Sequence, residues 1–76
     1  MNVERLTEAL NLLRRQAVLD DAMHRPGGIR VTEERELYEL RALLQKYSGA
    51  VKAILETSKR LHRPIDALSP HEVDTN

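Results

Sequence analysis

Apolar residues recur at steps of three and four along the first part of the chain, which is the spacing of one face of an α-helix. Asn2 is placed to cap the first turn of this helix. The segment Pro26-Gly27-Gly28 ends the pattern, because proline fixes φ and glycine supplies the positive φ that a tight turn requires. We therefore predict a helix over residues 3–24. Its apolar face consists of Val3, Leu6, Leu10, Leu13 and Ala17.

A longer apolar pattern follows the turn and again alternates steps of three and four. Thr32 is expected to cap this second helix. Ser48-Gly49 interrupts the helix propensity, and Gly49 could instead cap a helix that ends at Tyr47. The apolar phase continues across Gly49, so we predict one helix over residues 32–62, bent at that glycine. The pattern consists of Leu37, Leu40, Leu44, Tyr47, Val51, Ile54, Ser58 and Leu61, and it is widened by Leu43 and Leu55.

Pro64 ends the second helix, because the residue before a proline is steered away from helical angles. This divides the chain into a helical hairpin domain, residues 1–63, and a C-terminal tail, residues 64–76. Within the tail, Ser69-Pro70-His71-Glu72 combines an N-cap, a proline at the first position and a capping-box glutamate, which predicts a single helical turn. The apolar residues expected to hold the tail on the hairpin are Ile65, Leu68 and Val73.

A second apolar stripe on the first helix predicts contact with more than the second helix. Leu12, Leu19 and Met23 project from nearly the opposite side to the main apolar face. The simplest partner for this ridge is a second copy, so the fold class is all-α: an antiparallel helical hairpin that forms a dimeric four-helix bundle. The alternatives are a different protein partner, or exposed leucines without a partner.

The composition also favours association. The chain has 76 residues, no cysteine, no phenylalanine or tryptophan and two tyrosines. A core of this size is marginal, and disulfides are excluded as a means of stabilising it, which leaves oligomerisation. No apolar run reaches the roughly 18–20 residues of a membrane span and no signal-peptide pattern begins the chain, so we expect a cytoplasmic protein with no membrane partner.

The charges cancel in total but are unevenly distributed, with twelve basic against twelve acidic side chains. Acidic residues dominate the start of the second helix and the tail, whereas basic residues dominate the helix's far half. Four of these cations fall within about 40° on a helical wheel, which predicts a partner-binding surface for an acidic protein. The alternative is a nucleic-acid-binding regulator in which dimerisation doubles the stripe. The stripe consists of Arg41, Lys52, Lys59 and Arg63.

The sequence offers little chemistry. The three histidines, His24, His62 and His71, lack the spacing of a zinc site, and no serine lies at a motif spacing from a histidine. Asp20 and Asp21 are the remaining candidates as an acid pair. Asp20 is more simply explained either as exposed where the helix end frays or as buried and paired, and His24 and Arg25 lie one helical turn beyond the two acids. We therefore expect no catalytic residue, cofactor or metal, and a small regulatory or adaptor protein that acts as a homodimer through protein–protein interaction.

Overall fold

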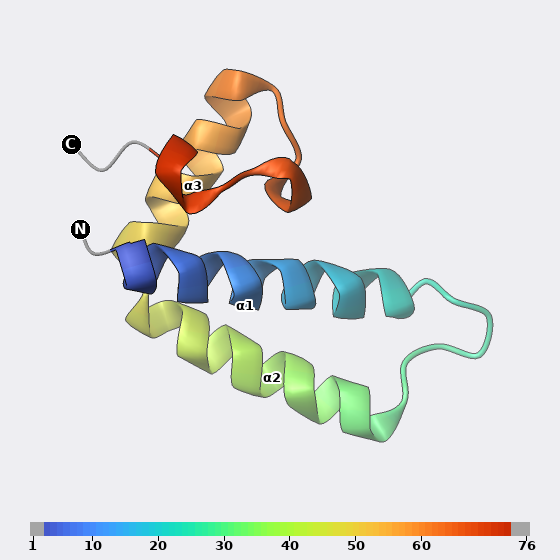
Figure 1. The fold of residues 1–76 in the computed structure, drawn as a ribbon. Coiled ribbons are helices and arrows are strands. Elements are labelled where there is room, and N and C mark those ends of the chain that lie inside the picture. Colours follow the sequence, from blue (N-terminus) through green and yellow to red (C-terminus); the bar gives the residue numbers. More distant parts are fainter. Residues whose placement is uncertain (1–2, 74–76) are drawn as a thin grey trace.

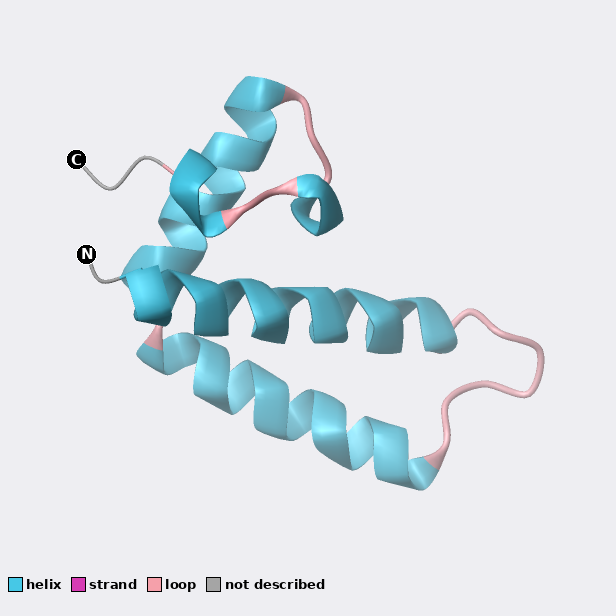
Figure 2. Cartoon of the chain, viewed as in Figure 1, coloured by secondary structure: helices cyan, strands magenta, loops and turns pink. Residues whose placement is uncertain are grey.

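Residues 3–73 are the part of the chain that the computed structural model describes, and they fold into three α-helices packed together (Figure 1). No strand occurs in this range, as Figure 2 shows. None of its helices is long and apolar enough to cross a membrane. The three helices, and the absence of strands between residues 3 and 73, confirm the all-α fold class. The elements are α1 (Val3–Ala22), α2 (Val31–Lys46), α3 (Ser48–Leu61) and two short 3-10 turns, η1 (Ile65–Ala67) and η2 (Pro70–Glu72).

α1 and α2 lie antiparallel and are joined by the predicted glycine turn (Figure 1). Gly27 and Gly28 have φ angles of 90° and 77°, which a side chain at either position would strain. α1 ends two residues before the predicted boundary at 24, and Asn2, its predicted cap, lies outside the described residues. α2 starts at Val31, so Thr32 is a helical residue rather than the cap, which is Arg30.

The prediction of one helix over residues 32–62 is wrong, because the chain leaves the helical path at Tyr47. The φ and ψ angles of Tyr47 are −110° and 27°, and α3 then turns away from α2 (Figure 1). α1 stabilises this break, since Arg5 donates a 2.6 Å hydrogen bond to the carbonyl of Lys46 and stacks over the Tyr47 ring at 4.9 Å. The Tyr47 hydroxyl donates to Glu8 Oε2 at 2.5 Å. Only one residue is lost from the helix, so the apolar phase survives the break.

The buried side chains form two clusters, which define a body and an arm. The body is the three-helix end, where α1 packs against the C-terminal end of α2, α3 and the tail. The arm is the remaining length of the α1–α2 hairpin, held by Leu19, Leu37 and Leu40, with Leu12 and Ile29 packed against them. The body cluster consists of Leu6, Ala9, Leu10, Leu13, Leu44, Ala50, Ile54, Leu68 and Val73.

The tail is part of the body, as the apolar residues in it predicted. Leu68 and Val73 are buried in the body cluster, and Arg14 of α1 donates a 2.5 Å hydrogen bond to the Leu68 carbonyl. The predicted turn forms as η2, where the Ser69 amide donates to Glu72 Oε1 at 3.1 Å. The division into a 1–63 domain and a 64–76 tail stays a prediction, and so does the dimeric four-helix bundle.

Candidate functional site

The three residues predicted to form an assembly ridge do not share one exposed surface. Leu19 is fully buried in the arm, where it belongs to the same cluster as Leu37 and Leu40, and Leu12 is half-buried beside them. These two side chains belong to the contact between α1 and α2, because α2 packs on that side of α1. The exposed-ridge interpretation is therefore wrong for Leu19. Met23 alone is exposed, at the C-terminal side of α1.

The predicted basic stripe is divided between two helices and partly neutralised. Arg41 lies on α2 before the break, with its Nη2 atom 3.7 Å from Oδ1 of Asp20, and Arg63 pairs with Glu72 of the tail. Lys52 and Lys59 remain together on α3, seven residues and two turns apart on one face. Neither lysine forms an ion pair with another residue between 3 and 73.

Asp20 and Asp21 lie in different surroundings. Asp20 is half-buried and faces Arg41 across the hairpin, whereas Asp21 is exposed on α1. Arg25, which lies one helical turn after Asp21, does not pair with it but donates to both carboxylate oxygens of Glu33 at 2.8 and 3.0 Å. Within the described range, no three histidine or acidic side chains gather closely enough to hold a metal ion.

An open groove of about 690 Å³ lies where α1, α2, α3 and η1 meet. It exists because α3 diverges from α2 at Tyr47 and uncovers the side of α1 beyond the body. We call it the three-helix groove. Its apolar lining continues the body core outward and consists of Leu13, Ala17, Leu44, Val51, Leu55 and Ile65. Leu55 is the most exposed large hydrophobic side chain in it, with 48% of its surface accessible.

Polar side chains surround this apolar lining. Asp20 and Arg41 form the ion pair that joins α1 to α2 at one edge, so their charges largely cancel. Lys52 stands at the α3 edge without an ion-pair partner in the described chain, and Lys59 continues that edge beyond the groove. The groove therefore offers an apolar surface with a positive border along α3. A volume of this size falls within the range that binding clefts occupy.

Sequence reasoning identified most of the groove's residues without bringing them together. The sequence places Leu55 beside the apolar pattern of residues 32–62, and it places Arg41 and Lys52 in one basic stripe. In a continuous helix, the apolar pattern would pack against α1 along its length and leave no groove. The groove could therefore not be deduced without the break at Tyr47. Comparison of the chain with protein-family models, with curated proteins and with solved structures finds no match.

Proposed function

We propose that this protein is a small non-catalytic adaptor or regulatory protein that binds an amphipathic α-helix of another protein in the three-helix groove. The observation that carries this proposal is the groove itself, an open apolar surface walled by helices. A partner helix recognises such a groove by laying its apolar residues, spaced at i, i+3, i+4 and i+7, along the lining.

The charge of the border specifies the partner further. Lys52 and Lys59 are the two cations of the predicted basic stripe that form no ion pair with residues 3–73, and both flank Leu55 on α3. A helix with acidic residues along the edge that meets α3 would pair with them. Electrostatic complementarity of this kind chiefly sets specificity and association rate, whereas the apolar contact supplies most of the affinity.

The pairing of the other cations favours a protein partner over nucleic acid. Arg41 and Arg63 already contact carboxylates, so only half of the predicted stripe is available to phosphates. Affinity for nucleic acid depends on the number of phosphates neutralised, and two free lysines supply little of it.

Two designed helical peptides test the proposal. Both carry the same leucine face, and they differ only in having glutamate or lysine along one edge. We expect the acidic peptide to bind about tenfold more tightly in fluorescence anisotropy, a difference of ~1.4 kcal/mol. Leu55→Glu should abolish the binding of both peptides because it places a carboxylate within the apolar lining. Replacing Lys52 and Lys59 together with glutamate should reverse the preference between the peptides.

Val18→Glu is the matched control, because Val18 is exposed to a similar extent on a face of α1 away from the groove. It should leave both affinities unchanged, and circular dichroism should show that every variant is folded. If neither peptide binds, the groove is not a helix-binding site. If mixed DNA or RNA binds instead and the double lysine replacement removes that binding, the protein is a nucleic-acid-binding regulator.

A further inference from the structure

The face of α2 that points away from α1 carries the two most exposed large hydrophobic side chains of residues 3–73. Val31 exposes 75% of its surface and Tyr38 exposes 63%. They lie seven residues apart, which places them two turns apart on the same side of the helix. We call this surface the outer α2 face. Figure 1 shows α1 against the other side of α2 and no described element against this one.

The outer α2 face contains a hollow with the geometry of a coiled-coil hole. The hollow has a volume of about 300 Å³, and its lining includes Val31, Glu34, Arg35 and Tyr38. These residues follow the spacing i, i+3, i+4 and i+7, which is the set of four side chains that receives one knob from a facing helix. Tyr38 is both a wall of this hole and the large exposed side chain nearest to the middle of α2. The same residue can therefore serve as the knob on a second copy.

The charges on this face are also self-complementary. Arg35 and Glu39 both border the hollow, carry opposite charges and form no ion pair with other residues between 3 and 73. By contrast, Glu33 and Glu36, on the side of α2 toward α1, pair with arginines of the loop and of α1. In a two-fold symmetric contact, residue i of one copy meets residue j of the other and the reverse. An antiparallel α2 pair thus places Arg35 of each copy opposite Glu39 of the other.

We propose that the outer α2 face binds the same face of a second copy of this chain, antiparallel and about a two-fold axis that passes midway between Arg35 and Glu39. Tyr38 of each copy fills the hole of the other, and two reciprocal Arg35–Glu39 pairs border the contact. This dimer replaces the ridge of Leu12, Leu19 and Met23 as the expected assembly surface. It does not rest on the three-helix groove, whose lining on α2 shares no residue with the hollow of the outer α2 face, so the two proposals can fail separately.

The experiment measures the dimerisation of a series of charge-reversal variants by sedimentation equilibrium. α2 has 16 residues and is about 24 Å long, so the contact is at the small end of specific interfaces. We expect dissociation constants in the range of about 10 µM to 1 mM. Arg35→Glu and Glu39→Arg should each weaken dimerisation about tenfold or more, because each places like charges opposite one another. The double variant Arg35→Glu/Glu39→Arg should restore the dimer, because it exchanges the two charges in both copies.

Tyr38→Glu should give a monomer at every concentration, and Val18→Glu is the control of similar exposure on α1. Circular dichroism distinguishes a folded monomer from an unfolded chain. The proposal is overturned if the unmodified protein is monomeric at about 1 mM, a concentration at which even a millimolar dimer would be half formed. A dimer that survives Tyr38→Glu, or one that the double charge exchange does not restore, places the self-association elsewhere.

Discussion

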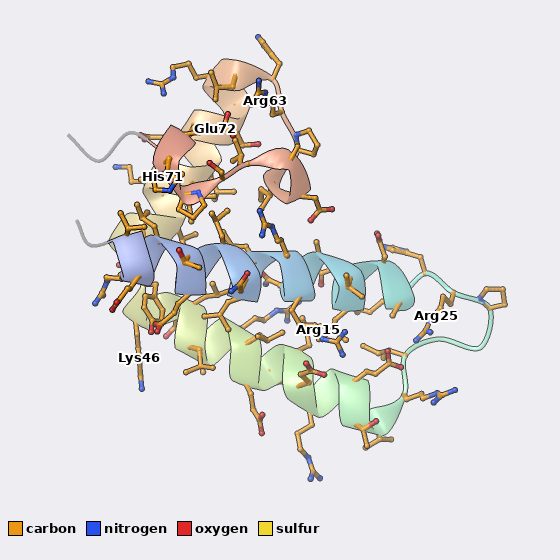
Figure 3. The ribbon with its side chains drawn as sticks, in the orientation of Figure 1. Arg15, Arg25, Lys46, Arg63, His71 and Glu72 are labelled. Carbon is orange, nitrogen blue, oxygen red and sulfur yellow. The ribbon has the colours of Figure 1, made fainter. Side chains whose placement is uncertain are left out.

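At the scale of single residues, ion pairs connect elements that are distant in sequence. Arg15 of α1 donates to both carboxylate oxygens of Glu36 on α2, at 2.8 and 3.0 Å, and Arg25 of the loop does the same to Glu33. Figure 3 shows Arg15 between the two helices and Arg25 beside the loop. Exposed pairs of this kind contribute little to stability, because solvent screens their charges. Their effect is mainly to fix how α1 and α2 lie against one another.

The Arg15–Glu36 pair should make the free energy of unfolding depend on pH in the acid range. The hydrogen bonds from Arg15 lower the pKa of the Glu36 carboxyl from its usual 4.5, although partial desolvation opposes the shift. The unfolded chain therefore binds this proton more readily than the folded one. The stabilisation is complete above about pH 4.5 and is lost as the pH falls through the lower pKa of the folded state. Glu36→Gln should reduce this acid-dependent loss in urea unfolding between pH 7 and pH 3.

Glu34→Gln is the control for this measurement, because Glu34 lies on the same helix and forms no ion pair with residues 3–73. It should leave the pH dependence close to that of the unmodified chain. Adding salt should weaken the contribution of Glu36, since screening reduces interactions between exposed charges. If the free energy of unfolding falls by the same amount between pH 7 and pH 3 in both variants, the Arg15–Glu36 pair does not contribute to stability in solution.

At the scale of elements, the sequence predicts the helices and turns that depend on local signals. The apolar period of α1, the paired glycines of the loop and the capping box of η2 all appear where expected. A helix that ends at Tyr47 is one alternative that the sequence offers, but the apolar pattern favours a continuous helix because the break depends on tertiary contacts. Arg5 and Glu8 hold Lys46 and Tyr47 from another helix, and no signal near Gly49 reports them. A periodic pattern records which side chains are buried, but not the direction of the helix that carries them.

The tail contributes to the core as an element, and this can be measured at Leu68. Its side chain is only 2% exposed and packs in the body cluster. Leu68→Ala should lower the free energy of unfolding by about 2–4 kcal/mol, because it removes buried apolar surface and leaves a cavity. Leu61→Ala at the end of α3, where 39% of the side chain is exposed, should cost much less. Equal costs in urea denaturation would mean that the tail does not pack on α1.

At the scale of the whole molecule, the break at Tyr47 gives the chain its shape and its three-helix groove. A continuous second helix would leave a two-helix hairpin, whereas turning α3 away produces a three-helix body and a two-helix arm (Figure 1). The three-helix groove lies where α3 leaves α2, and the outer α2 face extends along the arm. The groove residues Arg41 and Lys52 are predicted from the sequence as surface cations. Their position around the same groove as Leu55 follows only from the three-dimensional arrangement.

The unequal cores predict that the arm opens before the body. Three buried leucines hold the arm, whereas nine buried residues from α1, α2, α3 and the tail form the body cluster. Partial opening follows the distribution of buried contacts, so backbone amides at Leu19 and Leu37 should exchange hydrogen at least about tenfold faster than those at Leu10 and Ile54. Nuclear magnetic resonance at low protein concentration measures this. Raising the concentration should slow exchange in α2 selectively if its outer face binds a second copy. Uniform protection along all three helices would instead mean that the arm and the body unfold as a single unit.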